Sequence, residues 1–192
     1  MTVPQTFVVS KPHQLRELAS PVKQVILDAL AAAKEPRTMR ELAEDVNRAA
    51  DSLYYHMRSL VKSGLVIDAG TRLENGKQVA VYTAAAKRFR IKYDFGIPRF
   101  KQIMQSIFAA TIRLAKRNFE RGLELDNVRF GTKNRNLYMT RMEAWLSKQH
   151  LAEINRRIEE INEIMVDNCQ PSAGERCTVF VCLAPLAEKS RD

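Results

Sequence analysis

The stretch from Thr38 to Val66 constrains the fold of this chain most, because it carries the signals for two helices joined by a tight turn. Thr38 followed by Glu41 is the pattern of a capping box, in which the two side chains satisfy free backbone N–H groups where a helix begins. The inward side of this first helix is formed by four apolar residues, Met39, Leu42, Ala43 and Val46. We expect residues 47–50 to form the turn.

The second helix is expected to begin near Asp51 and to have one apolar and one polar face. Apolar residues recur at helical spacing, and they are Leu53, Met57, Leu60 and Val61. The residues left outside this stripe are Ser52, Tyr54, Tyr55, Arg58, Ser59 and Lys62. At the start of the helix the Asp51 carboxylate favours the positive end of the dipole, so we expect it to cap the helix. Gly64 stands where a left-handed residue would end it.

Helical segments precede this pair and a β-hairpin follows it. Residues 13–19 have helical character, and Ser20-Pro21 supplies an N-cap and an N1 proline for a core helix reaching about Ala33. Asn75-Gly76 is a strong hairpin signal between strands at 65–67 and 79–82. The apolar patch at 7–9 is either a docked arm or disordered. Helix, helix, turn, helix and hairpin is the order of a winged helix.

Two runs carry a family resemblance: residues 18–27, LASPVKQVIL, and residues 53–66, LYYHMRSLVKSGLV. The most specific part is His56 followed by an apolar residue, then Leu60 and the Gly-Leu-Val of 64–66. Over about residues 13–93 the chain resembles the ArsR-type (arsenic-repressor-like) winged-helix transcriptional regulators. The resemblance implies a dimeric bacterial or archaeal DNA-binding protein, often a repressor that releases its operator when an effector binds.

The chain differs from the metal-sensing branch of that family in the first helix of the motif. Where those sensors carry a cysteine pair, residues 40–45 read RELAED. The familiar thiolate site is missing, and we expect no bound metal. His13, His56 and His150 are far apart in sequence and offer no ligand spacing.

Composition favours a nucleic-acid partner. Lys and Arg number 31 against 22 Asp and Glu, a formal charge of +9 with a pI near 9.7, although a merely basic soluble protein would also fit. The three cysteines lie near the C-terminus, which argues against a secreted disulfide framework and for the cytoplasm. Neither a signal peptide nor an apolar run of about 18 residues occurs, so we expect no membrane association.

The C-terminal half is expected to be a second unit. We place a boundary between residues 1–93, the winged helix, and residues 94–192, an α+β dimerisation or effector domain, with residues 94–98 as a linker. From Ile97 to Phe119 apolar residues keep a rhythm of three to four positions, which predicts a long helix that packs in a dimer. The fold class is therefore mainly α with a β wing.

Beyond this helix, residues 137–146 and 177–183 are rich in β-prone side chains and are expected to pair as a small sheet. Ser147 is the expected N-cap of a helix between them, with Leu146 and Leu151 as a hydrophobic staple. Its apolar residues follow an a/d spacing that offers a narrow seam to a partner, at Leu151, Ile154, Ile158, Ile161 and Met165.

The cysteines and aromatic residues of this half have two interpretations each. Cys177 and Cys182 are five apart, so a regular strand would place them on opposite faces. We expect buried structural thiols, with a redox or metal switch including Cys169 as the alternative. Trp145, Tyr138 and Phe180 are expected in the core, and lining an effector pocket is the alternative.

The candidate DNA-binding residues follow from the geometry of helix-turn-helix proteins, in which the second helix enters the major groove. The base-proximal candidates are Ser52, Tyr54 and Tyr55. The candidate phosphate ligands are Arg40, Arg48, Arg58 and Lys62, with Arg72 and Lys77 on the wing. His56 is expected to have a mixed and mainly structural role.

We therefore expect a sequence-specific regulator that binds double-stranded DNA as a homodimer. The alternative is a winged-helix module whose tyrosine face contacts another protein, and a third hypothesis adds a small-molecule effector bound in the C-terminal half. The chain lacks the motifs of phosphate-binding loops, nucleophile elbows and His/Glu metal sites, so we expect neither an enzyme nor a cofactor.

Overall fold

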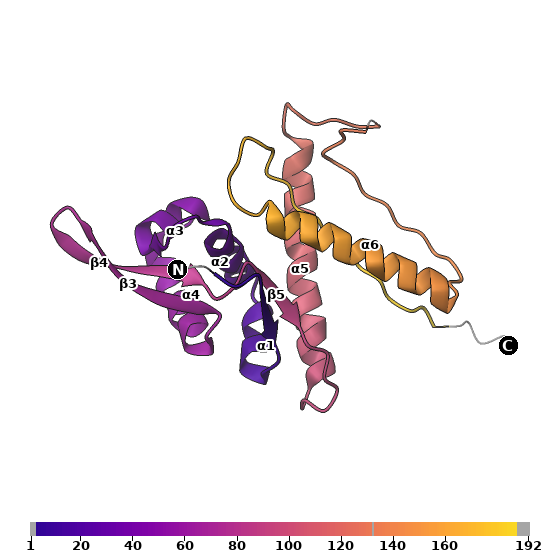
Figure 1. Ribbon diagram of the computed structural model, residues 1–192, viewed down its shortest axis with the longest axis horizontal. Coiled ribbons are helices and arrows are strands. Elements are labelled where there is room, and N and C mark those ends of the chain that lie inside the picture. Colours follow the sequence, from indigo (N-terminus) through magenta and orange to yellow (C-terminus); the bar gives the residue numbers. More distant parts are fainter. Residues whose placement is uncertain (1–2, 132, 188–192) are drawn as a thin grey trace.

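The computed structural model of the chain describes residues 3–131 and 133–187 and has mixed helix and strand, with the winged helix at one end (Figure 1). The helices are α1 (Pro12–Leu18), α2 (Pro21–Ala32), α3 (Met39–Asp45), α4 (Ala50–Ser63), α5 (Phe100–Leu123) and α6 (Lys148–Asp167). The strands are β1 (Thr6–Val9), β2 (Arg37–Thr38), β3 (Val66–Glu74), β4 (Lys77–Ala84) and β5 (Arg88–Ile91). The expected fold class is confirmed.

The first four helices share one hydrophobic core. Its largest fully buried side chains include Leu15, Ile26, Leu30, Leu42, Leu53 and Leu60. Burying a side chain of this size contributes roughly 1.5–3 kcal/mol. This core sets the orientation of α4, because three of the residues that α4 contributes to it, Leu53, Met57 and Leu60, recur on one side of the helix.

The two helices of the motif begin and end close to the predicted positions. The Thr38 hydroxyl accepts a hydrogen bond from the Glu41 N–H, and the Glu41 carboxylate accepts one from the Thr38 N–H at 2.8 Å. The capping box is confirmed. Helix α4 begins at Ala50, and its N-cap is Ala49 with no side-chain cap, so the capping role expected of Asp51 is wrong. Asp51 lies within the first turn.

The predicted wing is confirmed as the antiparallel pair β3 and β4. Asn75 and Gly76 have φ values of 50° and 76°, the left-handed conformations that a type I′ turn requires. Strand β2 adds to the other edge of β4 and makes the order β2-β4-β3. We did not predict β2, because a strand of two residues shows no periodicity.

The N-terminal segment is a docked arm. Strand β1 pairs in parallel with β5, Val9 is fully buried, and the rings of Phe7 and Phe89 lie 6.0 Å apart. We did not predict β5, because its arginines at 88 and 90 alternate with apolar residues over only four positions, too few to identify a strand.

Helix α5 continues the same core. Phe100, Ile103 and Ile107 are buried in the cluster that holds the winged helix together, and Gln24 donates to the Thr111 hydroxyl at 3.2 Å. The predicted long helix is confirmed, while the domain boundary after Tyr93 stays a prediction. Across the described ranges, no helix is both long and apolar enough to cross a lipid bilayer.

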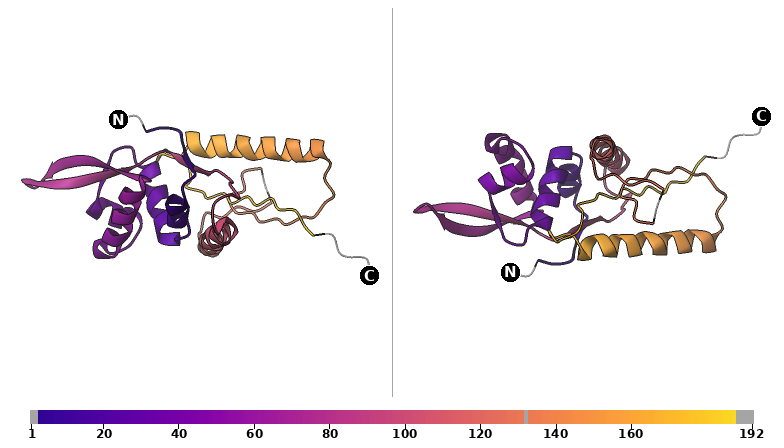
Figure 2. Two further views of the ribbon diagram at one scale, coloured as in Figure 1. Left: turned by 90° about the horizontal axis from the view of Figure 1, so that it is seen from below. Right: turned by 90° about the horizontal axis from the view of Figure 1, so that it is seen from above.

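The predicted helix after Ser147 is also confirmed, but the predicted C-terminal sheet is wrong. The Ser147 hydroxyl accepts a hydrogen bond from the His150 N–H at 3.2 Å and caps α6. Residues 137–146 and 177–183 run as extended chain without strand pairing (Figure 2). Both have β-prone side chains, but neither lies in register with a neighbouring strand of this chain.

Most side chains in these extended segments are exposed, and Leu137 and Leu146 are half-buried. Cys177 and Cys182 are exposed free thiols, and Cys169 is half-buried with its Sγ 3.7 Å from the Ala31 carbonyl oxygen. The expectation of buried thiols at 177 and 182 is wrong. Trp145, Tyr138 and Phe180 are exposed as well, so their expected place in the core is also wrong. Because these segments form no sheet, there is no hydrophobic core in which these side chains could be buried.

We predict that Gly64→Ala destabilises the protein by about 1 kcal/mol, because Gly64 has a φ of +75° that a Cβ disfavours. A Cβ there would meet nothing within 4 Å, so backbone strain alone is tested. Urea denaturation measures the effect. Asn47 also has a positive φ, 51°, and Asn47→Gly should be neutral or stabilising. Equal destabilisation by the two substitutions would contradict the strain argument.

Candidate nucleic-acid interface

Helix α4 presents the largest exposed aromatic surface of the winged helix. Tyr54 and Tyr55 are 53% and 77% exposed, although they follow a fully buried leucine in the sequence. Arg58 and Lys62 extend this exposed surface toward the C-terminal end of the helix. The two tyrosines can stack and donate hydrogen bonds, and the two basic residues beside them can bind phosphates.

At the N-terminal end of α4, Ser52 is exposed and its hydroxyl donates a hydrogen bond to the Ala49 carbonyl oxygen at 2.7 Å. This contact holds the side chain close to the first turn. The hydroxyl oxygen keeps lone pairs that can accept a hydrogen bond.

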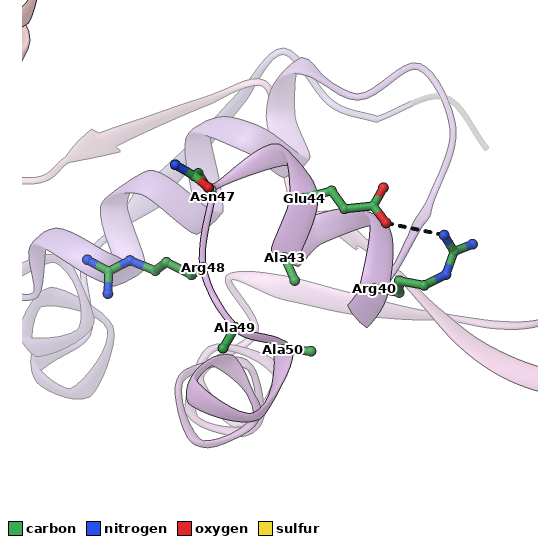
Figure 3. A pocket seen from close by; sticks show the side chains of 7 residues that line it. All are labelled: Arg40, Ala43, Glu44, Asn47, Arg48, Ala49 and Ala50. Carbon is green, nitrogen blue, oxygen red and sulfur yellow. Dashed lines mark hydrogen bonds and ion pairs between the residues drawn. The ribbon is translucent and has the colours of Figure 1, made fainter.

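A shallow, open depression lies where α3 meets the turn into α4 (Figure 3). It is lined by Arg40, Ala43, Glu44, Asn47, Arg48, Ala49 and Ala50. Arg40 and Arg48 extend to opposite sides of it. Both are exposed, but Arg40 also contacts the Glu44 carboxylate at 3.2 Å. Arg48 is the more available cation of the two.

His56 lies at the border between the exposed and buried sides of α4. Its ring stands edge-on to the Tyr55 ring at 5.8 Å, and its Nδ1 is buried without a hydrogen-bond partner among the described residues. Burial lowers the pKa of His56 below its ordinary value, and the nearby Lys23 and Arg48 charges lower it further. The imidazole is therefore neutral near pH 7.

A polar cluster behind α4 joins three helices. The Lys23 ammonium donates to the Glu17 carboxylate at 2.5 Å and to the Ser59 hydroxyl at 3.1 Å, while Ser59 donates to Glu17 at 2.7 Å. The Glu17 and Lys23 side chains are only 14% and 12% exposed. Ser59 is expected on the outer face, but it is half-buried and tied to α1 and α2.

Sequence reasoning missed Glu17 and Lys23, because Glu17 and Ser59 are 42 positions apart and no local pattern links them. A second long-range contact lies one turn further along α4, at its C-terminal end. The buried Gln14 amide donates to the Ser63 carbonyl oxygen at 3.1 Å. The C-terminal part of α4 is thus held against the preceding helices by polar contacts.

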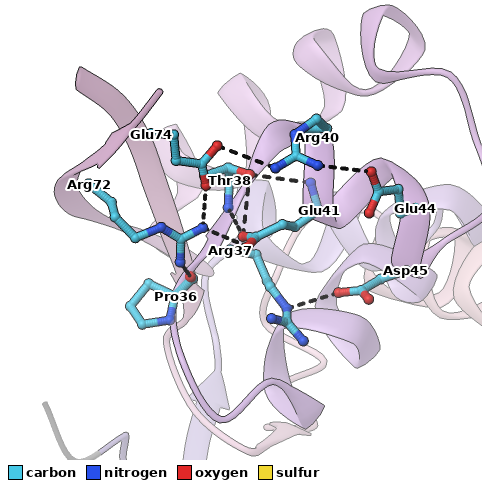
Figure 4. A network of polar contacts seen from close by, with 9 residues as sticks. All are labelled: Pro36, Arg37, Thr38, Arg40, Glu41, Glu44, Asp45, Arg72 and Glu74. Carbon is cyan, nitrogen blue, oxygen red and sulfur yellow. Dashed lines mark hydrogen bonds and ion pairs between the residues drawn. The ribbon is translucent and has the colours of Figure 1, made fainter. Parts of the chain in front are cut away.

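The wing is joined to α3 by a network of arginines and carboxylates (Figure 4). The Arg72 guanidinium contacts Glu41 and Glu74 at 2.6 Å each, and Arg40 contacts Glu74 at 3.4 Å. The hydrogen bond from Arg72 holds the pKa of Glu74 below its ordinary value, and the bond from Arg40 adds to this. Glu74 is therefore ionised and orients both arginines.

Most of the predicted site residues fall into two groups. Ser52, Tyr54, Tyr55, Arg58 and Lys62 share α4 and are exposed, whereas Arg40 and Arg72 are bound to carboxylates between α3 and the wing. Lys77 is exposed at the start of β4, beside the hairpin turn. Their roles in DNA binding stay predictions. In the part of the chain that the structure describes, no group of three or more His, Cys, Asp or Glu residues could hold a metal ion.

We predict that Glu17→Gln lowers the free energy of unfolding by about 1–3 kcal/mol, because it leaves the poorly hydrated Lys23 ammonium without its carboxylate. Chemical denaturation measures this. Glu35 is exposed, and Glu35→Gln is the matched control with an expected change within about 0.5 kcal/mol. A similar change in both variants would show that the cluster does not stabilise the fold.

We also predict that stability falls as the pH drops below about 6.5, partly through His56. Its pKa is lowered in the folded protein, so the unfolded chain takes up this proton at a higher pH than the folded chain does. The contribution of His56 to the free energy of unfolding is fully present above the pKa of the unfolded chain. It is lost as the pH falls toward the lower pKa of the folded protein. Urea denaturation at about pH 7.5 and about pH 5.5 should show a smaller loss for His56→Gln than for the wild type.

His13 is exposed, and His13→Gln serves as the control for this pH comparison. It should lose as much stability as the wild type over the same interval. If His56→Gln and the wild type lose the same amount, His56 is not a source of the pH dependence.

Comparison with known proteins agrees with the geometry over the motif. Residues 18–68 match a protein-family model described as a helix-turn-helix domain. A possible transcriptional regulator from Methanosarcina mazei Go1 is a structural neighbour with 15% identity and a TM-score of 0.29, covering 55% of this chain and 77% of its own. That likeness is too low to carry an argument. No curated protein matches the chain. Residues 18–68 therefore form a helix-turn-helix domain, and the ArsR subtype stays a prediction.

Proposed function

We propose that this protein is a sequence-specific transcriptional regulator that binds double-stranded DNA through α4. The observation that carries the proposal is the exposed tyrosine face of α4, flanked by basic residues and followed by a β-hairpin wing. In proteins with this motif the second helix lies in the major groove, with residues from its N-terminal part at the base edges. The chain acts by binding, and we propose no catalytic role.

Ser52, Tyr54 and Tyr55 occupy the part of α4 that reaches base edges in this arrangement. Their hydroxyl groups can donate and accept hydrogen bonds, and the tyrosine rings can contact thymine methyl groups. Arg48, Arg58 and Lys62 supply positive charge around them and would bind phosphates, which sets register without reading sequence.

On the wing, we propose different roles for the two basic residues. Arg72 is bound to two carboxylates, so it holds the wing against α3 and orients it for DNA. Lys77 is exposed beside the hairpin turn, and it is our candidate for the phosphate contact of the wing. Arg40 shares Glu74 with Arg72 and can exchange this carboxylate for a phosphate.

We propose further that the regulator is a homodimer that presents two α4 helices to half-sites about one DNA turn apart. A small-molecule effector remains an additional hypothesis, which ligand-induced thermal stabilisation would support. The alternative function is a winged-helix module that contacts another protein through the same tyrosine face.

The test begins with selection of bound fragments from genomic DNA, which yields a recognition site and its half-site spacing. Binding to that site should weaken steeply with salt, with a slope of about −0.9 per phosphate contact in a plot of log K against log salt. We predict that Tyr55→Ala weakens binding by roughly 10-fold or more, equivalent to about 1.4 kcal/mol. Its salt slope should stay unchanged, since a base contact is lost.

Arg58→Ala should weaken binding and also reduce the magnitude of the salt slope by about 0.9, because it removes one phosphate contact. Tyr93 is 68% exposed outside the motif, and Tyr93→Ala is the control that should bind normally. Duplex binding that is absent or insensitive to salt would overturn the proposal. A protein partner lost on Tyr55→Ala, without any DNA binding, would favour the alternative function.

A further inference from the structure

The C-terminal half of the chain has no interior of its own. Within residues 3–131 and 133–187, the last buried hydrophobic residue is Leu114. All later residues that the structure describes are half-buried or exposed, including those of the 20-residue helix α6. Ordering a chain costs conformational entropy that is normally offset by burial of apolar surface, and here that burial is missing.

A large apolar surface is exposed in the same region. It includes Tyr138, Met139, Met142, Trp145, Leu151, Ile161, Ile164, Val179, Phe180, Val181, Leu183 and Leu186. The exposed fractions of these residues add up to about seven whole side chains. Since a large side chain has roughly 150–250 Å² of surface, the exposed apolar area is on the order of 1,000 Å². A stable dimer buries about 800 Å² on each partner. The exposed area is therefore sufficient for a dimer interface.

The backbone of the two extended segments is also free. Among the described residues, no N–H or C=O group of 137–146 or 177–187 makes a hydrogen bond within the chain. Phe180 lies 6.3 Å from Phe108 of α5 and Leu137 packs over Gly122, so α5 supports one side of these segments. Helix α6 lies on their other side (Figure 2). Two β-prone strands are marginal alone, whereas four from two copies make a sheet large enough to be stable.

Helix α6 adds a seam with the spacing that pairs helices. Its apolar residues at 151, 154, 158, 161 and 165 follow a heptad, and none of them is buried. Among the described residues, the polar contacts of α6 with the winged-helix half are few. Arg88 donates to Glu159 at 2.9 Å, and the Sγ of Cys169, just beyond the helix, approaches Ala31. The seam is thus only partly covered by the chain itself.

The charge of this region fits a second copy better than a polyanion. Residues 137–187 contain five basic and seven acidic residues, whereas residues 1–136 contain 24 basic and 13 acidic ones. On α6, Arg156 and Arg157 both pair with Glu153 and Glu160, so these four charges are neutralised within the helix. The region carries a small net negative charge, so two such surfaces repel each other only weakly, and the phosphates of DNA gain nothing there.

We propose that a second copy of this chain covers the apolar surface formed by residues 137–146, residues 177–187 and α6, so that the C-terminal half completes its core only in the dimer. This interface is isologous, because each copy contributes the same segments. This proposal rests on the homodimer of the proposed function, and it adds the surface through which the two copies bind each other. It does not involve the DNA-contacting face of α4.

Trp145 provides a direct probe, because it is the only tryptophan of the chain and is 100% exposed in the single copy. Analytical ultracentrifugation of the full chain should show a dimer. Between about 0.1 and about 20 µM protein, its fluorescence should shift to shorter wavelength and become shielded from iodide as the dimer forms. A monomer throughout this range, or a dimer in which Trp145 stays fully accessible to iodide, would overturn the proposal.

Val181→Lys places a charge within the proposed interface and should raise the dimer dissociation constant on the order of 100-fold or more. Leu73 is 65% exposed on the wing, and Leu73→Lys is the matched control that should leave the dimer intact. Equal effects of the two substitutions, or no effect of Val181→Lys, would place the interface elsewhere.

DNA binding to a single half-site separates this proposal from the proposed function. Val181→Lys should retain half-site binding with the salt slope of the wild type, because α4 and the wing are unchanged. A dimer that buries Trp145 but binds no DNA supports this interface and overturns the DNA-binding proposal. A monomer that binds half-sites supports the DNA-binding proposal and overturns this interface.

Discussion

The structure depends on α4 burying one side while leaving the opposite side free. Leu53, Met57 and Leu60 are almost completely buried, and their spacing makes the same face of the helix point inward along its length. Rotation of the helix by one position would expose these residues and bury the tyrosines, at a cost of several kcal/mol in lost apolar burial. The core therefore determines which side chains reach a partner, and the tyrosines need no contact of their own to stay outside.

Polar contacts add a positional constraint that apolar packing cannot supply, because hydrogen bonds are directional. The cluster of Glu17, Lys23 and Ser59 ties α4 to α1 and α2, and the carboxylate of Glu74 ties the wing to α3 through Arg40 and Arg72. Each contact joins elements that would otherwise slide over apolar surface. The surface for DNA in the proposed function is thus built from two separately anchored parts, a helix and a hairpin.

The parts of the fold that could be predicted from sequence are those specified by neighbouring residues. The capping box of Thr38, the left-handed Gly64 and the Asn75-Gly76 turn each need only a few adjacent positions. The parts that could not be predicted depend on distant residues. Strand β5 exists because β1 lies beside it, and the Glu17–Ser59 contact spans 42 positions. The same reason explains the failed sheet, since β-propensity at 137–146 and 177–183 needs a partner strand that one copy does not place in register.

Charge and hydrophobicity divide the chain between two kinds of partner. The positive excess lies before residue 137, in the part of the chain that contains the winged helix and α5, while the later residues are nearly neutral and expose apolar side chains. Electrostatic attraction acts over distances near the Debye length of about 10 Å, whereas apolar burial acts only on contact. A polyanion is therefore drawn to residues 1–136 and not to α6. The C-terminal half can instead bind an apolar surface of matching shape. A second copy of this chain offers such a surface, because it carries the same repeated apolar positions on α6.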